Sequence, residues 1–290
     1  MKIPFVKMSG AGNDVILVDH RDRALVGREE ELARFACHRR FGVGADALIL
    51  LEDASDADFH VRFFNPDGGE YALCGNGARC VPLFAKELGF EGPRYRFTSA
   101  SGRHVGEMLA DGGGRIELPP VREVKLDIPA DVDGRAVTLD WGDIGVPHAA
   151  LWVDDVDAVP IERWGAHLRA HPAFGPHGTN VSFVQRLRDG SLRIRTFERG
   201  VEGETWACGS GSSVVATIAV RRGWCVSPVR LTVRAGGTLV VRVSADAKDP
   251  LLLEGPVQRC FEGVMEFAGG ETGRAPAISA AGARPARESA

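Results

Sequence analysis

Two cysteines far apart in the chain each stand directly before a Gly-x-Gly segment. Residues 73–79 read LCGNGAR and residues 207–213 read ACGSGSS, which places Cys74 and Cys208 at equivalent points of the two segments. Each copy follows a strand-like run that ends near an acidic residue, and each precedes small and apolar residues that can form a helix. The repetition indicates two thiols that face a shared cleft.

A Gly-x-Gly segment at a helix start can bring the backbone close to an anion. Glycine permits the approach, while unpaired N–H groups and the helix dipole favour a negative charge such as a carboxylate. The same dipole stabilises a thiolate, so we expect it to lower the pKa of Cys74 and Cys208 from the usual value of about 8.5. One such segment is also compatible with an ordinary tight turn, but two in matching contexts favour a functional site.

Two thiols on opposite faces of one bound carboxylate suit the inversion of a carbon centre. A thiolate removes a proton from one face, and a thiol delivers a proton to the other. The helix N-termini stabilise the carbanion that forms beside the carboxylate. Because no lysine lies in a context typical of a pyridoxal Schiff base, the pattern predicts a racemase or epimerase that needs no cofactor.

Other uses of the cysteines are weaker interpretations. Structural zinc sites contain close cysteine pairs, whereas Cys74 and Cys80 have five residues between them and no matching second pair, so we expect no metal. Disulfides are not expected in a reducing compartment. Cys37, Cys225 and Cys260 lie among apolar or ordinary helix and strand residues, and we interpret them as small core side chains.

The composition indicates a small-molecule partner. The chain has 290 residues, of which 44% are hydrophobic and 26% charged, which is typical of a globular protein with two domains. A net charge of -4, with acids and bases mixed, offers no basic stripe for nucleic acid and no polybasic membrane patch. Without a secretory signal or an apolar run near the roughly 20 residues of a membrane helix, we expect a cytoplasmic protein.

The strand and helix patterns occur twice, which predicts an α+β fold of two similar domains related by pseudo-twofold symmetry. In each domain we expect a curved mixed or antiparallel sheet around the helix that follows the cysteine, with the active site in the interdomain cleft. The expected helices are 29–37, 81–88, 161–168 and 214–220, and the expected strands are 15–18, 47–51, 61–64, 149–153, 180–184, 192–197, 229–233 and 238–243.

The domain boundaries follow from the same pattern. The first domain is expected at residues 1–125 and the second at 126–256, with the proline-containing segment 119–129 as the crossover. A terminal strand at about 257–267 would return to the first domain. Residues 269–290, rich in Ala, Gly, Pro and Arg, are expected to form a disordered tail.

Seven segments, in order along the chain, resemble those of the diaminopimelate epimerase family and together cover about residues 3–267. The resemblance implies interconversion of LL- and meso-diaminopimelate in lysine and peptidoglycan precursor synthesis. It also implies a two-domain fold that closes on the substrate, and a homodimer. The segments are KMSGAGND (7–14), RFGVGAD (40–46), NPDG (65–68), CGNGARC (74–80), PH (147–148), GTNV (178–181) and ERG with GETWACGSG (198–200 and 203–211).

The resemblance implies roles for individual residues. Cys74 and Cys208 would be the acid/base thiols, while His148 and Glu198 would tune their pKa values or hold an ammonium group. Arg199 suits the distal carboxylate of the substrate, because a guanidinium binds a carboxylate bidentately. The remaining implied contacts are the backbones of Gly75, Asn76, Gly209 and Ser210 with the reacting carboxylate, Asn13 near the reacting amino group, and Asn65, Asn180 and Glu198 along the substrate.

Simpler interpretations of these residues exist. Asn13 and Asn65 adjoin turns, where asparagine often bonds only its own backbone. His148 follows a proline and would suit a satisfied strand end, and Glu198 and Arg199 would suit an ion pair in solvent. On the same grounds we expect Trp206 and Cys80 to pack against their neighbours.

The chain departs from the family pattern near the distal end. Val146 stands where the family often has asparagine, and Ala47 where some members carry a polar side chain. The loop from Glu198 to Cys208 is one residue longer than in the commonest pattern, and Ser210 replaces a frequent threonine. These changes leave the reaction type untouched and bear on recognition of the distal end.

Two further functions compete with this one. A related two-cysteine racemase would act on another amino acid, such as proline, hydroxyproline or histidine, but a monocarboxylic substrate has no need of Asn65, Asn180 and Arg199. A noncatalytic binding protein on the same scaffold would have no reason to keep both cysteines.

Overall fold

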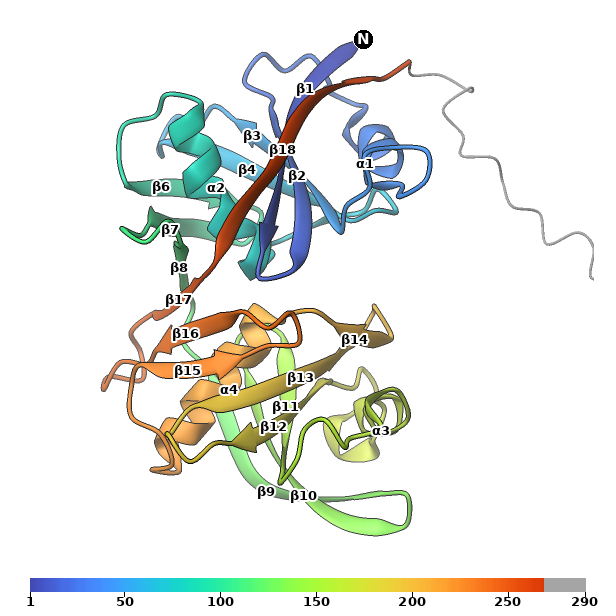
Figure 1. The fold of residues 1–290 in the computed structure, drawn as a ribbon, viewed down its shortest axis with the longest axis vertical. Helices are drawn as coiled ribbons and strands as arrows, with labels where there is room; N and C mark the ends of the chain where they lie inside the picture. The colour runs from blue at the N-terminus through green and yellow to red at the C-terminus, as the bar shows by residue number, and fades with distance from the viewer. Residues whose placement is uncertain (269–290) are drawn as a thin grey trace, which may run out of the picture.

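The computed structural model describes residues 1–268, which form two bodies joined end to end (Figure 1). The chain crosses from the first body to the second after β8 and returns through β17 and β18. The prediction for residues 269–290 lies outside the described residues. Within residues 1–268, no helix is long and apolar enough to cross a membrane.

The first body begins with a strand hairpin and contains two helices. Its elements are β1 (Lys2–Gly10), β2 (Asn13–Asp19), α1 (Glu29–Cys37), β3 (Ala47–Glu52), β4 (Phe59–Phe64), β5 (Glu70–Tyr71), α2 (Gly75–Glu87), β6 (Arg94–Ser99), β7 (Gly102–Met108), β8 (Gly114–Leu118) and the last strand of the chain, β18 (Val257–Glu266).

From β10 onward the second body repeats the order of elements that runs from β1 to β8, with one short 3-10 helix added; its first strand, β9, takes the place that β18 has in the first body. Its elements are β9 (Glu123–Val132), β10 (Arg135–Asp143), β11 (Pro147–Val153), α3 (Ile161–Arg169), η1 (Pro172–Phe174), β12 (Asn180–Arg186), β13 (Leu192–Glu198), β14 (Gly203–Thr205), α4 (Gly209–Arg221), β15 (Val229–Thr232), β16 (Thr238–Arg242) and β17 (Leu251–Gly255).

The strand pairings of the two bodies correspond one to one. The first runs β18-β1-β2-β3-β4-β6-β7-β8, with β2–β3 and β4–β6 parallel. The second runs β9-β10-β11-β12-β13-β15-β16-β17, with β11–β12 and β13–β15 parallel. Antiparallel pairing of β8 with β17 joins them. The predicted α+β fold of two similar halves is confirmed, and β18 pairs with β1 in the first half.

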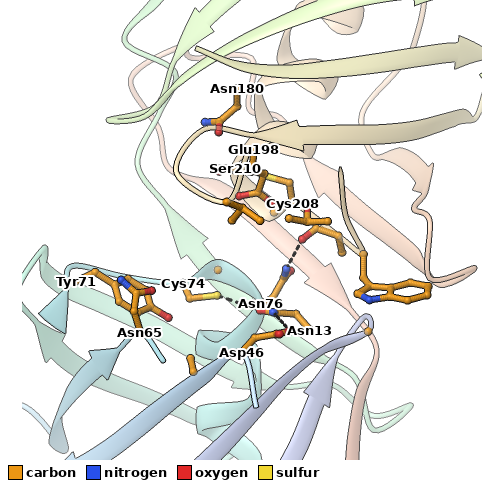
Figure 2. Close-up of a pocket in the computed structure, with 18 of the residues that line it drawn as sticks. Asn13, Asp46, Asn65, Tyr71, Cys74, Asn76, Asn180, Glu198, Cys208 and Ser210 are labelled. Atoms are coloured by element: carbon orange, nitrogen blue, oxygen red, sulfur yellow. Dashed lines mark hydrogen bonds between the residues drawn. The ribbon is translucent and has the colours of Figure 1, made fainter. Parts of the chain in front are cut away.

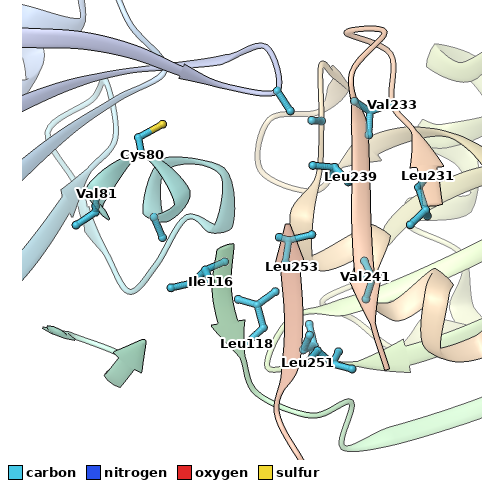
Figure 3. Close-up of a cluster of buried hydrophobic side chains, with 14 of the residues drawn as sticks. Cys80, Val81, Ile116, Leu118, Leu231, Val233, Leu239, Val241, Leu251 and Leu253 are labelled. Carbon is cyan, nitrogen blue, oxygen red and sulfur yellow. The ribbon is translucent and has the colours of Figure 1, made fainter. Parts of the chain in front are cut away.

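Each sheet is covered on both faces. Helices α1 and α3 pack on the outer faces with their own apolar clusters, while α2 and α4 share one continuous core. This shared core passes through the β8–β17 pairing, where Ile116 opposes Leu253 and Leu118 opposes Leu251 (Figure 3). Because the two halves bury apolar side chains against each other, this shared core holds the starts of α2 and α4 in a fixed relation.

The two helices that follow the cysteines begin earlier than predicted. The sequence suggested starts at residues 81 and 214, but α2 begins at Gly75 and α4 at Gly209. Glycines and Pro82 are poor helix formers, so propensity places the starts too late. Burial overrides propensity here, since most residues of both helices are shielded from solvent, as we expected for the helix after the second cysteine.

Two further expectations are corrected by the structure. The crossover ends at residue 122, and Pro129 lies within β9, which tolerates proline because it is an edge strand paired only with β10 among the described residues. Of the three cysteines interpreted as core residues, Cys37 is buried, Cys225 is partly exposed and Cys260 is exposed. Cys260 lies on β18, most of whose side chains face solvent.

Candidate active site

A cleft of about 890 Å³ lies between the two halves and is lined by residues from both (Figure 2). It is bounded by the starts of α2 and α4 and by the loops before them. The predicted site residues that line it are Asn13, Asn65, Cys74, Gly75, Asn76, Asn180, Glu198, Arg199, Cys208, Gly209 and Ser210. Of the predicted set, His148 alone does not line the cleft, because it lies behind Ser210.

Cys74 caps the N-terminus of α2. Its Sγ accepts a hydrogen bond from the Gly77 N–H at 3.4 Å and donates one to Asn13 Oδ1, also at 3.4 Å. Asn13 is itself held, because its Nδ2 donates to Asp46 Oδ2 at 2.6 Å. Asn13 therefore bonds a neighbouring side chain rather than only its own backbone, and its carbonyl oxygen is oriented toward the thiol.

Cys208 occupies the N-cap position of α4, but unlike Cys74 its side chain makes no capping hydrogen bond to the first turn. Its Sγ lies 3.5 Å from Ser210 Oγ, and Ser210 Oγ lies 2.9 Å from His148 Nε2. Gly211 completes this arrangement, since a Cβ at that position would lie 3.2 Å from His148 Nδ1 and 3.3 Å from the Cys208 Sγ. A side chain at this position would therefore crowd both the thiol and the imidazole.

Burial dominates the protonation of both thiols. It raises the pKa of Cys74, although hydrogen bonds from Gly77 and Asn76 lower it, and it raises the pKa of Cys208 well above its usual value, with the charge of Glu198 adding to the rise. The expectation that the helix dipoles leave both thiols with a lowered pKa is wrong. The free-energy cost of removing a thiolate from water exceeds the stabilisation that the helix N-terminus provides.

His148 and Glu198 are both tuned by burial. His148 is fully shielded, and burial with the nearby charge of Arg199 lowers its pKa to about 3, so it is a neutral imidazole. Burial raises the pKa of Glu198, whose Oε1 accepts a hydrogen bond from Thr205 Oγ1 at 2.5 Å. Within residues 1–268, no ion pair joins Glu198 to Arg199, so that simpler interpretation is wrong.

The starts of α2 and α4 converge on one side chain of β17. A Cβ at Gly75 would lie 3.5 Å from Leu253 Cδ2, and a Cβ at Gly209 would lie 2.7 Å from the same atom. The first-turn N–H groups of both helices have no carbonyl partner within their helix. Two sets of such donors at one cleft can bind a single carboxylate, as the repeated cysteine segments suggested.

The side chains predicted at the distal end have different environments. Asn65 is exposed at the cleft. Asn180 is buried, with its Nδ2 bonded to Pro147 O at 3.1 Å and its Oδ1 accepting from the Arg199 N–H at 2.8 Å. Arg199 Nη1 donates to the His177 carbonyl at 3.3 Å. Asn180 thus holds the backbone of Arg199, and Val146, 39% exposed, forms an apolar part of the wall.

Sequence reasoning assigned no role to three residues at the cleft. Asp46 holds Asn13, and Thr205 holds Glu198. Tyr71 and Thr205 each stand three residues before a cysteine of the repeat. An alignment of the two cysteine segments that extended to the residues before each cysteine would have identified Tyr71 and Thr205 as equivalent positions. Trp206 also lines the cleft, is 52% exposed and lies under Arg234, whose Cζ is 4.7 Å from the indole ring centroid.

The residues that the structure describes contain no group of three or more His, Cys, Asp or Glu side chains placed to hold a metal ion. Cys80 is buried on α2, with its Sγ 3.7 Å from the Asn76 carbonyl, which fits the expected packing on its own helix.

Comparison with known proteins identifies the family. The sequence model of the family described as diaminopimelate epimerase matches residues 5–122 and 141–260. This chain belongs to the diaminopimelate epimerase family. A diaminopimelate epimerase from Archaeoglobus fulgidus is 38% identical over 283 residues, which cover 92% of this chain and 98% of the relative. One from Aquifex aeolicus is 37% identical over 270 residues, 89% of this chain and 96% of the relative.

Solved structures share the fold of this diaminopimelate epimerase family member at low sequence identity. A phenazine biosynthesis protein of the PhzF family from Bacillus anthracis matches with a TM-score of 0.71 and 17% identity, covering 92% of this chain and 100% of that one. A probable proline racemase from Agrobacterium radiobacter, with bound carbonate, matches with a TM-score of 0.66 and 19% identity, covering 92% and 93%. The two-domain fold therefore extends beyond the family.

Proposed function

We propose that this protein is an isomerase that interconverts LL- and meso-diaminopimelate through two thiols, without pyridoxal phosphate. The observation that carries the proposal is that Cys74 and Cys208 each occupy the N-cap position of a helix that begins at the same cleft. Membership of the diaminopimelate epimerase family supplies the substrate. The reaction belongs to the synthesis of lysine and peptidoglycan precursors.

The reaction needs one thiolate and one thiol. The thiolate takes the proton from the substrate's α-carbon, forming an S–H bond while the C–H electron pair moves into the α-carbon and its carboxylate. The opposite thiol then gives its proton to the other face of that carbon and becomes a thiolate. No oxidant or reductant is consumed, and the two sulfurs have exchanged roles.

The two thiols have unequal surroundings, which indicate which of them is ionised before the reaction. Glu198 places a negative charge beside Cys208, which favours the protonated thiol there. The charge of Glu198 raises the pKa of Cys74 as well, but there it ranks behind the hydrogen bonds from Gly77 and Asn76 that lower it, so Cys74 is the more readily ionised. We infer that Cys74 is the resting thiolate when the substrate's ammonium group enters, because a cation beside it offsets the cost of burial.

The helix starts stabilise the charge that develops on the reacting carboxylate. The backbone N–H groups of Gly75, Asn76, Gly209 and Ser210 are fixed before the reaction begins, so they need no rearrangement as charge grows. Asn13, positioned by Asp46, suits the reacting amino group. Arg199, positioned by Asn180, suits the distal carboxylate, and Asn65 and Glu198 suit polar groups between them.

Isotope exchange tests this function. Incubation of the full chain with LL-diaminopimelate in deuterium oxide is expected to give the meso isomer with deuterium at the inverted carbon. Proline, trans-4-hydroxyproline and histidine serve as comparison substrates in the same assay. Exchange with one of these amino acids, and none with diaminopimelate, would overturn the substrate and favour the related racemase.

We also propose that the protein works as a homodimer in the cytoplasm. Phe261 and Val264 are 47% and 58% exposed on β18, which pairs only with β1 among the described strands, so a second copy has an exposed strand edge with two apolar side chains to cover. A Phe261→Lys variant measured by light scattering, beside the parent chain, tests this association. A reducing compartment suits a mechanism in which both thiols must stay free.

A further inference from the structure

Arg79 is a fully buried cation on α2, three residues after Asn76. Its side chain has no exposed surface, and its Nε and Nη2 have no hydrogen-bond partner among the described residues. Its Nη1 donates to Asn76 Oδ1 at 3.0 Å and to the Gly75 carbonyl at 3.3 Å. Burial lowers its pKa to about 10, so it remains charged at neutral pH.

Other buried acidic side chains of this protein, apart from Glu198 at the cleft, have charged partners or a histidine beside them. Asp140 bonds Arg222, Glu204 bonds Arg195, and Glu52 bonds His20. Within residues 1–268, by contrast, the Arg79 guanidinium has no carboxylate partner, and its hydrogen bonds go to Asn76 and to the Gly75 carbonyl. An unpaired charge in the interior is costly, so its retention points to a negative charge that is absent from the side chains around it.

The guanidinium lies at the meeting point of the two helix starts. A Cβ at Gly209 would lie 3.8 Å from Arg79 Nη1, and a Cβ at Gly255 of β17 would lie 3.2 Å from Arg79 Nε. Its partner Asn76 reaches across the domain boundary, where Nδ2 donates to the Ala207 carbonyl at 2.7 Å. A chain of hydrogen bonds thus runs from Arg79 through Asn76 to the residue before Cys208. The bond that Asn76 donates is drawn in Figure 2.

We propose that Arg79 is a positioning residue for the epimerisation, whose unpaired charge is balanced by the anion at the two helix starts and whose bond to Asn76 holds α2 in register with Cys208. The proposal rests on the proposed function, because that reaction places a thiolate and a carboxylate in the cleft. A carbanion beside the carboxylate increases the negative charge in the transition state, which the fixed cation stabilises.

Several groups act on the Cys74 thiol, and Arg79 is one of them. Burial raises the pKa of Cys74 most; N–H donors from Gly77 and Asn76 lower it, the charge of Glu198 on β13 raises it, and the charge of Arg79 lowers it. Tyr71 on β5 also bonds this thiol. Removal of the Arg79 charge alone is therefore expected to make Cys74 harder to ionise.

Paired substitutions separate charge from packing. Arg79→Met removes the charge at similar length, and Arg79→Lys keeps it. With diaminopimelate in deuterium oxide, Arg79→Met is expected to lower kcat roughly 100-fold, whereas Arg79→Lys stays within about tenfold of the parent. In a plot of kcat against pH, the acidic limb reports ionisation of Cys74. We expect this limb to move to higher pH by about half a unit or more in Arg79→Met only. Arg222→Met, remote from the cleft, controls for destabilisation.

Two outcomes overturn the proposal. One is a kcat for Arg79→Met within about threefold of the parent value, because such a decrease is far smaller than the one expected when a fixed charge is lost. The other is an equal loss in Arg79→Met and Arg79→Lys with an unmoved acidic limb, since that result assigns Arg79 a purely structural role.

A second pair serves if Arg79→Met fails to fold. Asn76→Asp supplies the missing carboxylate beside Arg79, and Asn76→Ser loses the same amide without adding charge. We expect kcat of Asn76→Asp to fall at least about tenfold below that of Asn76→Ser, because the added carboxylate neutralises the cation. Equal values would contradict the proposal.

A measurement without substrate separates this proposal from the proposed function. The alkylation rate of Cys74 by iodoacetamide, followed by peptide mass spectrometry across pH, reports its ionisation directly. A midpoint raised in Arg79→Met and retained in Arg79→Lys supports the role of Arg79 even if the parent chain turns over another amino acid. An unshifted midpoint in Arg79→Met counts against it.

Discussion

The Asn76 side chain donates a hydrogen bond to the Ala207 carbonyl across the domain boundary, at 2.7 Å. This bond joins the second residue of α2 to the residue immediately before Cys208. The spacing of the two thiols is therefore fixed by a direct contact between the cysteine segments as well as by the β8–β17 pairing. A change at either segment is expected to affect the chemistry at both.

Loss of either thiol should abolish epimerisation. Cys74→Ala and Cys208→Ala each remove one of the two proton carriers, so we expect turnover to fall by at least about 10³-fold, near the upper range for general acid/base groups. Conversion of LL- to meso-diaminopimelate measures this, because one remaining thiol can exchange the α-proton on its own face without inverting the carbon. Cys260→Ala, at an exposed position on β18, is the matched control and should retain parental turnover. Near-normal turnover in either active-site variant would refute the two-thiol mechanism.

Alanine at the two helix starts should have unequal effects on stability. A Cβ at Gly209 would lie 2.7 Å from Leu253 Cδ2, which is fully buried, so Gly209→Ala is expected to lower the free energy of unfolding by about 1–3 kcal/mol. At Gly75 the same contact is an ordinary 3.5 Å, and Gly75→Ala should change stability by less than about 1 kcal/mol. Urea unfolding measures both.

Relief of that contact provides the control for the helix-start prediction. Leu253→Val shortens the side chain, so Gly209→Ala combined with Leu253→Val should be more stable than the sum of the two single changes predicts. Strict additivity would show that Leu253 is not the source of the strain.

His148 should make stability depend on pH. Burial holds its folded-state pKa at about 3, below the value of about 6.5 expected in the unfolded chain. The unfolded state therefore binds the proton more readily, and the stability from neutral His148 is complete above about pH 6.5 and is lost as the pH falls toward 3.

Urea unfolding of the parent and a His148→Gln variant at several pH values between 7 and about 5 checks this expectation. Glutamine can still bond Ser210 but does not titrate, so the loss of stability on acidification should be smaller in the variant. The buried His104 also has a pKa lowered by burial and contributes equally to both proteins. Parallel plots of the free energy of unfolding against pH for the two proteins would contradict the role given to His148.

The apolar wall at Val146 should weaken recognition of the distal end of the substrate. Val146→Asn adds a hydrogen-bonding group at a cleft position, so we expect KM for diaminopimelate to fall by about fivefold, the equivalent of one net hydrogen bond, with kcat unchanged. Steady-state kinetics measures both constants. Val226→Asn, at an 87% exposed position away from the cleft lining, is the control. A fall in kcat instead would show that Val146 acts at the reacting centre.

The duplicated elements were the most predictable part of the fold. Short buried strands such as β2 and β12 carry a strong local pattern of consecutive apolar residues, and their predicted ranges agree with the structure to within two residues. The starts of α2 and α4 were missed because glycine and proline oppose helix formation locally. Contacts from the opposite half, such as Leu253, stabilise those first turns, and such contacts leave no mark in a local window.

The sequence by itself indicated the type of reaction and predicted Cys74 and Cys208 as the residues that carry it, because reaction type depends on chemical identity and one cysteine segment occurs in two copies. Tertiary structure alone decided the direction of the pKa shifts of the thiols and the lack of a carboxylate partner for Arg79 within residues 1–268. Both properties depend on burial, which arises from contacts with segments far apart in the chain. The spacing of residues along the sequence does not reveal those contacts.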